Sequence, residues 1–519
     1  MTAPRPDVAR TVEIWTPANG LDLNTPVSRM DLSYLPFIQN FKIQDGYYIG
    51  REGTKYLNTY AEPTGLMASF VWQTPQDVEW ILRFTKTQMQ YYDWGIGGWI
   101  NVSGISPNMS GGDSDYFQWT GYGSKLLFVN GKDGIYQTDL STVPPTVTKF
   151  GTGPVAPKFI TTFGGRVIAS NISGAPGRIQ WSVKNNSTDW SGIGSGYDDL
   201  VSTPGGGIDE SFGVYPVNDA QALVVRSHSI WLMSLTGDVN VPHRFSMLYA
   251  NFGCDDPYSI VPVPGGIVGL FRDNVYFVNE ATIQPLGNTI SSMFRVSGNE
   301  NYINRSPNNK AVGAYDPDVR EYRLALRLIG GTVVLRYGFT HQHWTQDWYP
   351  VNIKHIFGFP KLWSSPIYDS RLIMTGTDNR TFYETINWLQ DVSGGGGYVD
   401  ASMYLVSGVI RATDSYHKTR LLKIFVEYDY STLGAFEDVE MQFYYSYDNW
   451  TWTPFPGTVL LSHIPNTAIS RIGSTELSLE NRTIQIRAIV PGPLPIKIYS
   501  VMVRISGNED EPVQQEAAV

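Results

Sequence analysis

Short apolar runs separated by turn residues fill most of the chain, and the stretch 163–190 is a typical example. A Gly-Gly pair at 164–165 predicts a tight hairpin turn, and a short apolar run at 166–170 follows it. Residues 178–182 then alternate polar and apolar side chains, as a half-buried strand does. Trp190 ends the unit after a polar turn. This pattern predicts half of a four-stranded antiparallel blade, with large aromatic side chains to fill the space between neighbouring sheets.

Similar units recur from about Leu66 to Trp388 at a period of about 40–50 residues, which is typical of propeller blades. A closed ring of blades leaves no long unpaired edge strand, which suits a chain so rich in β-forming residues. We therefore predict an all-β fold with a β-propeller of six or seven blades. The predicted units lie at 70–102, 116–136, 158–190, 222–233, 267–278, 322–337 and 371–384, and the last is either a seventh blade or the strands that close the ring.

The pattern changes after the glycine run in 393–398, which predicts a linker. Longer alternating strands follow and predict a C-terminal β-sandwich-like domain. The resulting division of the chain is an N-terminal arm with lead-in strands at 1–60, the β-propeller at 61–392, the linker at 393–398, the β-sandwich-like domain at 399–506 and a disordered acidic tail at 507–519.

Composition agrees with this fold and limits the classes of function. Hydrophobic residues make up 42% of the chain and charged residues 17%, which is typical of a globular protein, and the 13% aromatic content with 51 Gly and 32 Pro favours strands and turns. The formal charge of −10 argues against a surface that coats nucleic acid, but it permits a channel along which DNA slides. A single cysteine, Cys254, excludes an intrachain disulfide.

The sequence contains no apolar run of about 18 residues and its N-terminus lacks an apolar signal-peptide region, so we expect no membrane-spanning segment and folding in a cytoplasm.

The stretch 163–190 also carries a resemblance. The elements Gly-Arg-Val-Ile, Gly-Arg-Ile-Gln-Trp-Ser and Asp-Trp, followed by the glycine-rich turn 205–208, resemble the tail nozzle proteins of short-tailed bacteriophages, also called packaged-DNA stabilisation proteins. The phrase from Asn40 to Gly53 is similar to the start of many phage tail and nozzle sequences, where it precedes the first blade. The resemblance extends loosely over 30–505, and its specific parts are 163–235 and 440–505.

The resemblance implies a structural virion protein without a catalytic motif. Members of the family assemble as a ring, commonly a homohexamer, below the portal and tail adaptor, with tail needle or fibre proteins as further partners. Packaged double-stranded DNA is retained by the ring and then ejected through its lumen without sequence readout. The expected location is the virion tail, after assembly in the host cytoplasm. The acidic composition leads to the further hypothesis that acidic residues line the lumen and repel phosphate.

Several local motifs resemble functional sites, and each has a structural explanation. The segment 446–452 resembles the Asp-box turn of sialidases, which stabilises a hairpin and performs no catalysis. His341 and His343 could share one face of a strand, but no third metal ligand follows at compact spacing. The acidic pairs at 113–115 and 255–256 lack the rest of a calcium loop, and the glycines at 151–153 and 205–207 lack a following Gly-Lys-Ser/Thr.

We therefore predict no catalytic, cofactor-binding or metal-ligating residues, no cofactor and no enzymatic activity. The alternative is a propeller-type tail protein that degrades or binds glycans, with some of the 15 Trp and 31 Tyr side chains as stacking platforms for sugars. Paired carboxylates and arginines that converge on one pocket would favour the enzyme, and glycan binding by the isolated subunit would favour the receptor-binding protein.

Overall fold

The structure is a computed structural model of the chain. It describes residues 9–15, 17–105, 109–201, 209–295, 303–304, 310–328, 331–360, 367, 370–385, 390–410, 418–430, 437–448, 450–462, 471–481, 484–492 and 496–508. These residues are almost entirely strands and turns, and their single α-helix is the short α1 (Ser292–Arg295). None of their helices combines the length and hydrophobicity that a transmembrane span requires.

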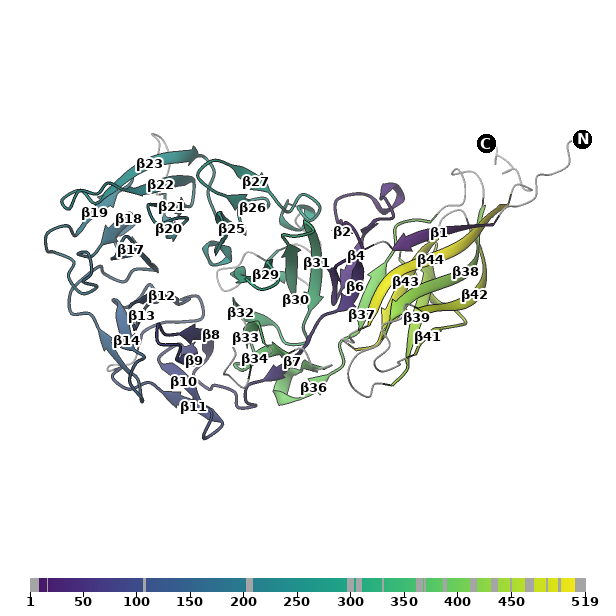
Figure 1. Cartoon of the computed structure of the whole chain (residues 1–519), viewed down its shortest axis with the longest axis horizontal. Coiled ribbons are helices and arrows are strands. Elements are labelled where there is room, and N and C mark those ends of the chain that lie inside the picture. Colours follow the sequence, from purple (N-terminus) through teal and green to yellow (C-terminus); the bar gives the residue numbers. More distant parts are fainter. Residues whose placement is uncertain are drawn as a thin grey trace, which may run out of the picture.

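Seven four-stranded antiparallel blades form a ring, which confirms the predicted propeller and sets its blade count at seven (Figure 1). The first strand of each blade lies next to the central axis, and the fourth lies at the rim. Blade one comprises β8 (Leu66–Gln73), β9 (Glu79–Thr85), β10 (Met89–Asp93) and β11 (Gly98–Asn101). Blade two comprises β12 (Gln118–Tyr122), β13 (Lys125–Val129), β14 (Tyr136–Asp139) and β15 (Thr146–Lys149). Blade three comprises β16 (Phe159–Phe163), β17 (Arg166–Ile172), β18 (Ala175–Trp181) and β19 (Gly196–Asp199).

The remaining blades continue around the axis in chain order. Blades four to six comprise β20 (Ser211–Pro216), β21 (Gln221–Arg226), β22 (Ser229–Leu235) and β23 (His243–Ala250); β24 (Val261–Val263), β25 (Gly266–Leu270), β26 (Val275–Val278) and β27 (Ile283–Pro285); and β28 (Val312–Asp316), β29 (Glu321–Leu328), β30 (Gly331–Gly338) and β31 (His343–Trp348). Blade seven comprises β32 (Ile353–Gly358), β33 (Leu372–Gly376), β34 (Thr381–Thr385) and an N-terminal strand, β7 (Gly53–Tyr56).

The ring is closed by this exchange of an N-terminal strand. Because β7 is the outer strand of blade seven, the chain before the first blade and the chain after the sixth belong to the same sheet. Side chains also join the two ends of the ring, since Ser69 of blade one contacts the hydroxyl of Thr381 at 2.8 Å and accepts a hydrogen bond from Thr375 at 3.0 Å. A strand contributed by the opposite end of the chain keeps the ring from opening at its seam.

Aromatic stacking fills the space between blades, as the composition predicts. Between blades one and two, the rings of Phe70 and Trp119 stack with centroids 4.1 Å apart, and those of Phe84 and Phe117 stack at 4.4 Å. All four rings belong to one apolar cluster that spans both sheets. Most of the aromatic residues of this region are therefore packing groups.

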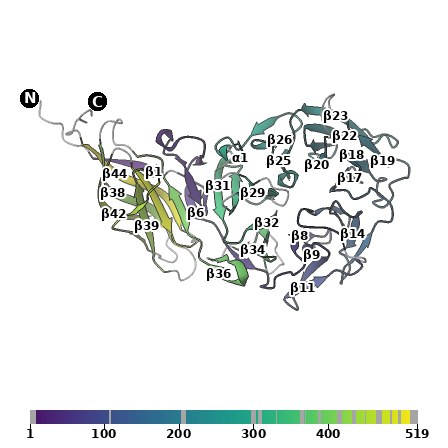
Figure 2. The same cartoon turned by 180° about the vertical axis from the view of Figure 1, so that it is seen from behind.

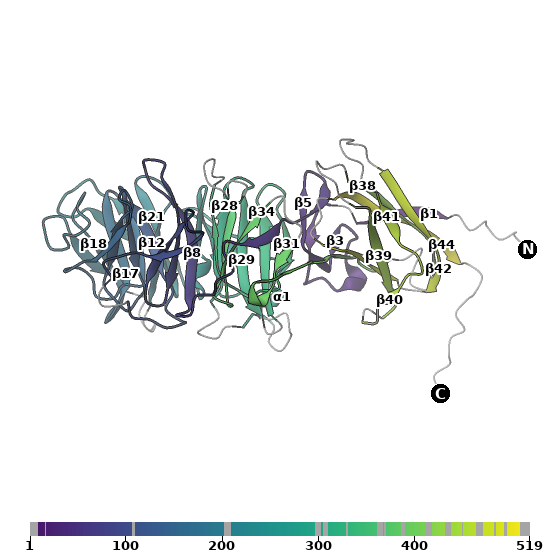
Figure 3. The same cartoon turned by 90° about the horizontal axis from the view of Figure 1, so that it is seen from below.

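Two packed sheets form the second domain, which lies beside the propeller disc and in line with it (Figure 3). One sheet contains β42 (Arg471–Asn481), β38 (Lys418–Asp429), β44 (Lys497–Asn508), β6 (Tyr47–Gly50) and β5 (Phe41–Gln44), with β1 (Arg10–Trp15) also paired to β44. The other contains β4 (Phe37–Gln39), β37 (Met403–Val406), β43 (Gln485–Val490), β39 (Val439–Ser446) and β40 (Thr453–Pro454), with β41 (Val459–Leu461) paired to β39. The start of β1 pairs with the end of β44 at the end of the sandwich that lies far from the propeller (Figure 2).

The segment predicted as an arm with lead-in strands at 1–60 is distributed over both domains. Its strands β1 and β4–β6 complete the sandwich, whereas β7 completes the propeller. The short β2 (Gly20–Leu21) and β3 (Tyr34–Leu35) pair with each other beside β31. The sandwich is therefore built from both ends of the chain.

The glycine run predicted as a linker is the turn of a small hairpin. The 3-10 turn Gly394–Gly396 connects β35 (Asp391–Val392) to β36 (Tyr398–Val399), and Gly395 and Gly396 adopt positive φ angles of 85° and 91° there. The predicted tail at 507–519 overlaps the last two residues of β44, and from residue 509 it lies outside the described residues.

Candidate functional site

The propeller and the sandwich meet around a cluster of buried charges. Strand β31 of blade six pairs with β4 in parallel through Gln346 and Gln39, so that blade six and one sandwich sheet form a continuous twelve-stranded sheet. Charged side chains lie at this seam and on the adjacent strands. We call them the junction cluster: Arg51, Asp316, Glu321, Arg323, Arg336, Asp347, Glu384 and Asp391.

Arg51, between β6 and β7, connects the most segments in the cluster. Its side chain is fully buried and donates from both terminal nitrogens to the carboxylate of Asp391, which is also fully buried. Its Nε donates to Asn40 Oδ1 at 3.0 Å, and its terminal nitrogens also donate to the carbonyl oxygens of Glu52 and Trp348 at 2.8 and 2.9 Å. The guanidinium lies 4.2 Å from the ring centre of Tyr349. One side chain therefore holds the lead-in strands, blade six and the hairpin after blade seven together.

Two further arginines in blade six lie among four carboxylates. Arg323 contacts Glu384 at 2.7 Å, Glu321 at 3.3 Å and Asp316 at 3.8 Å. Arg336 contacts Asp347, and its Nε lies 3.4 Å from Glu321. The carboxylates outnumber the arginines, so attraction to the arginines does not fully offset the desolvation of the carboxylates. Burial therefore raises the pKa of Asp316 and that of Asp347.

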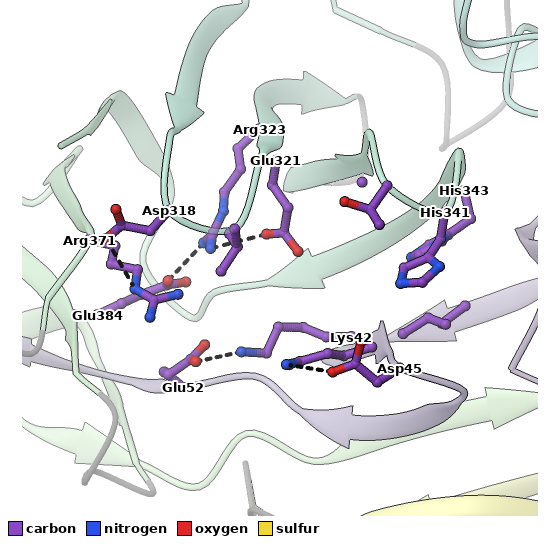
Figure 4. Close-up of a pocket in the computed structure, with 15 residues that line it drawn as sticks. Lys42, Asp45, Glu52, Asp318, Glu321, Arg323, His341, His343, Arg371 and Glu384 are labelled. Atoms are coloured by element: carbon purple, nitrogen blue, oxygen red, sulfur yellow. Dashed lines mark hydrogen bonds and ion pairs between the residues drawn. The ribbon is translucent and has the colours of Figure 1, made fainter. Parts of the chain in front are cut away.

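A cavity of about 390 Å³ opens beside the junction cluster (Figure 4). Its walls come from strands β5, β29 and β34 and from the turns around them. We call it the junction pocket; its charged and imidazole lining residues are Lys42, Asp45, Glu52, Asp318, Glu321, Arg323, His341, His343, Arg371 and Glu384.

Carboxylates and arginines converge in the junction pocket, which is the arrangement that the enzyme alternative requires. Four of the five acids that line the pocket are engaged by cations, and the fifth, Asp45, accepts from the amide of Gln44 at 3.4 Å. Glu52 pairs with Lys42, and Glu384 accepts from Arg323 at 2.7 Å and from the hydroxyl of Tyr349. Arg371 lies 3.8 Å from Asp318, and Glu321 is shared by the two blade-six arginines.

The electrostatics of the pocket oppose acid catalysis by these groups. Desolvation would raise the pKa of Glu52, but Lys42 and the blade-six arginines outweigh it and hold that pKa below its usual range. The pKa of Glu384 is likewise lowered by Arg323, against desolvation. A general acid for glycoside cleavage needs a raised carboxyl pKa. Both glutamates are therefore held as ionised partners of cations.

His341 and His343 both line the junction pocket, but only His343 lies in a strand, so the shared strand face that their spacing allowed does not form. His341 lies in the turn before β31, and Gln342 between them has a φ of 54°, so the turn brings the two rings together with centroids 5.8 Å apart. Burial lowers the pKa of His343 to about 4. Among the described residues no group of three His, Cys, Asp or Glu side chains is arranged to hold a metal ion.

The acidic loop at 113–115 is an ion-pair and turn element. Asp113 accepts hydrogen bonds from Lys86 at 2.9 Å and Lys354 at 3.1 Å, so it joins blade one to blade seven. Asp115 accepts from the backbone N–H of Gly112 at 2.8 Å. The positions of these carboxylates follow from ion pairing and turn geometry.

The residues around Cys254 also have structural roles. Cys254 is fully buried, its thiol lies 3.1 Å from the carbonyl oxygen of Leu270, and burial raises its pKa. Asp256 is buried and precedes a 3-10 turn at Pro257–Ser259. The glycine turn at 205–208 lies outside the described residues.

The described residues of 446–452 form the hairpin turn that the Asp-box resemblance predicts. The carboxylate of Asp448 accepts hydrogen bonds from the backbone N–H groups of Trp450 and Thr451, at 2.9 and 2.7 Å, and from the hydroxyl of Ser446 at 3.0 Å. These bonds lower the pKa of Asp448. The turn connects β39 to β40 and presents Trp452 on the sandwich surface.

Sequence reasoning missed the junction cluster. The segment Gly50-Arg51-Glu52-Gly53 belongs to the stretch that resembles phage tail and nozzle sequences. Nothing in its spacing indicates a contact between Arg51 and Asp391, which lies 340 residues away. Charged residues that alternate with apolar ones in a strand are ordinarily solvent-facing. The one available signal was the density of charge in 316–347, where arginines and acids recur within β29–β31.

Comparisons with known proteins find only distant structural similarity. No family model matches the chain, and no curated protein matches it. Solved structures that resemble it include a chain in the crystal structure of the mitotic checkpoint complex, with 10% identity over 64% of this chain and 97% of that chain and a TM-score of 0.37. The β-propeller domain of Myceliophteria thermophila Cps50 (Swd1) is similar at 9% identity over 63% of this chain and 100% of that domain, with a TM-score of 0.39.

Proposed function

We propose that the chain is a structural subunit of a bacteriophage tail, a nozzle protein that forms a homohexameric ring with neighbouring tail adaptor and needle or fibre proteins. The observation that carries the proposal is the junction between the domains. A continuous sheet and a buried charge cluster join the seven-bladed propeller to the sandwich, so the two domains form one stiff, elongated body (Figure 3). A subunit that forms the wall of a DNA passage must keep its shape under load, and a large, well-paired interface between domains limits their relative motion.

The all-β architecture suits this role for a second reason. Propeller blades bury their faces against one another, and the closed ring protects its edges, so the domain is stable without a ligand. DNA ejected through the ring would meet the outer surface of these subunits. The formal charge of −10 favours passage without adhesion, because phosphate is repelled.

Electron microscopy tests the ring directly. Negative-stain images of the purified full chain, and immunogold labelling of virions, are expected to show rings of six subunits located at the tail. Light scattering of the same preparation is expected to give the mass of six chains. A protein that stays monomeric at every concentration and is absent from virion tails would overturn the proposal.

DNA binding by the assembled ring tests the lumen hypothesis separately. We expect non-specific double-stranded DNA to bind more weakly than about 10⁻⁴ M at physiological salt, the weak end of ordinary non-specific binding. Tight binding that weakens steeply with salt would indicate a basic lumen. That result would refute the hypothesis of an acidic lumen but would not contradict the proposed ring.

The convergence of acids and arginines in the junction pocket favours glycan degradation as the second candidate. The pairing of four of these acids, Glu52, Asp318, Glu321 and Glu384, with cations supports the structural role instead. Hydrolysis of host-surface polysaccharide by the wild type, lost in Glu321→Gln and retained in the exposed control variant Glu280→Gln, would establish the enzyme. We expect no hydrolysis by the wild type or by either variant.

A further inference from the structure

The outer face of one sandwich sheet carries a polar and aromatic groove. Successive side chains of a strand point to opposite faces, and on β4, β37 and β43 one set is buried in the core: Ile38, Leu405 and Ala488 are examples. The alternate set faces outward. In cross-strand order, Phe37 lies opposite Val406, Val406 opposite Arg487, and Arg487 opposite Tyr444.

The propeller supplies one wall of this groove. Because β31 continues the same sheet, Trp348 at its end lies on the same outward face as the sandwich residues, and it is 43% exposed. The Asp-box turn supplies Trp452 at the opposite side. Together these elements enclose a cavity of about 680 Å³ lined by Val27, Pro36, Phe37, Gln39, Trp348, Asp400, Ser402, Tyr404, Val406, Trp452, Gln485 and Arg487, which we call the aromatic groove.

Two buried polar atoms in the aromatic groove have no hydrogen-bond partner in the part of the chain that the structure describes. Gln485 is 3% exposed, its amide nitrogen donates to the carbonyl oxygen of Ser407 at 3.0 Å, and its Oε1 accepts no hydrogen bond within the described part of the chain. The Nε of Arg487 is likewise buried and has no acceptor there. Leaving buried polar atoms unpaired costs free energy, and a ligand that supplies a donor and an acceptor recovers it.

Aromatic rings hold the arginine in place. The guanidinium of Arg487 lies 4.6 Å from the ring centre of Tyr444 and 4.9 Å from that of Trp452. Stacking of this kind fixes the plane of the guanidinium and leaves its edge available for hydrogen bonds. Phe37 and Tyr404 pack edge to face beside it, with centroids 6.4 Å apart.

We propose that the aromatic groove binds an oligosaccharide built of pyranose rings. A pyranose presents a C–H face that stacks on aromatic rings and a rim of hydroxyl groups that both donate and accept. Trp348, Trp452 and Tyr404 supply the rings, while amide, carboxylate and guanidinium groups supply both kinds of hydrogen-bonding partner. The volume falls within the usual range for ligand sites, about 300–1,000 Å³.

Concavity and planar polar groups favour a sugar over a flat protein partner. Among its described lining residues the groove has a single carboxylate, Asp400, whose Oδ1 accepts from Gln390 at 3.1 Å. Glycoside hydrolysis in most enzymes needs two carboxyl groups that flank the scissile bond. We therefore expect binding without cleavage. The inference does not depend on the ring, since the groove belongs to one subunit.

The test is a glycan array with the full chain, followed by titration calorimetry and saturation-transfer NMR with maltotriose, chitotriose and trigalacturonate. At least one class of saccharide is expected to bind. Trp348→Ala and Trp452→Ala are each expected to weaken binding roughly tenfold or more, because each removes a stacking surface. Trp94→Ala is the matched control, since Trp94 is 45% exposed on blade one and should leave binding unchanged.

Arg487→Lys separates acidic from neutral ligands. Lysine keeps the positive charge of Arg487 but loses the planar guanidinium with its paired N–H donors. Binding of an acidic saccharide, which depends on the charge, should therefore weaken less than binding of a neutral saccharide, which depends on paired hydrogen bonds to its hydroxyl groups. Circular dichroism melts of all four variants establish that each is folded.

The proposal fails if no saccharide on the array binds, or if Trp94→Ala weakens binding as much as Trp348→Ala does. Capture of a defined protein partner that depends on Trp348, together with no saccharide binding, would assign the groove to a protein interface instead.

Discussion

Replacing Arg51 by methionine tests whether the junction cluster holds the two domains together. Methionine keeps most of the side-chain volume but removes the charge and every hydrogen-bond donor. Asp391, whose side chain is fully buried, then loses its bidentate partner and keeps the hydroxyl of Thr54 at 3.1 Å. The carbonyl oxygen of Trp348 and the Oδ1 of Asn40 also lose their bonds to Arg51.

We expect the free energy of unfolding to fall by about 3–5 kcal/mol, because breaking a buried ion pair strands its partner in a medium of low dielectric. Arg178→Met is a close control. Arg178 also makes a bidentate pair, with Asp199 at 2.7 and 2.6 Å, and also stacks on a tyrosine ring, Tyr197, at 3.9 Å. That pair is solvent-exposed, with side chains 28% and 54% accessible, so its loss should cost about 0–1 kcal/mol.

Urea unfolding followed by tryptophan fluorescence and by circular dichroism gives both numbers. Hydrogen exchange read by mass spectrometry locates the effect, which should appear first in β7, β35 and the end of β31 for Arg51→Met. The double variant Arg51→Met/Asp391→Leu should recover part of the loss, with a coupling energy of about 1–3 kcal/mol. Equal losses for the Arg51 and Arg178 variants, or strictly additive effects in the double variant, would refute the reasoning.

Three further outcomes follow from burial. Burial lowers the pKa of His355 to about 4, so the unfolded chain binds more protons than the folded chain between pH 6.5 and 4, and stability is lost as the pH falls through that window. In urea melts, His355→Phe should reduce the slope of the free energy of unfolding against pH by up to about 1.4 kcal/mol per pH unit. An unchanged slope would count against this effect. Cys254 should react with a thiol reagent such as dithiobis(nitrobenzoate) only after unfolding, and rapid labelling of the native protein would contradict its burial. Gly313→Ala should lower the free energy of unfolding by about 1–3 kcal/mol, because its Cβ would lie 2.2 Å from the carbonyl oxygen of Ser259. Gly151→Ala, with open space around it, should be nearly neutral. Similar melting temperatures for both variants would show that the strand shifts freely.

The glycan proposal concerns ligand binding by one subunit and the ring proposal concerns assembly of subunits, so each has its own test. A ring with no affinity for saccharides would leave the aromatic groove without its proposed ligand. A monomer that binds saccharides through Trp348 would favour the receptor-binding alternative over the nozzle.

Local pattern was enough to determine the propeller. Blade hairpins are short-range structures, so Gly164-Gly165, with positive φ angles of 58° and 73°, and the alternation in β18 could be recognised from neighbouring residues alone. The Asp-box turn at Asp448 was predictable for the same reason, because all its hydrogen bonds join residues within three positions.

Long-range pairing was decided only by the tertiary structure. The period of the repeat could not reveal that β7 completes blade seven or that β1 and β4–β6 complete the sandwich, because strand partners hundreds of residues apart leave no local signature. The same holds for Arg51 and Asp391, and for the aromatic groove, whose side chains come from six separate segments. Alternation tells which side chains share a face of one strand, whereas the order of strands in the sheet decides which of those faces become one site.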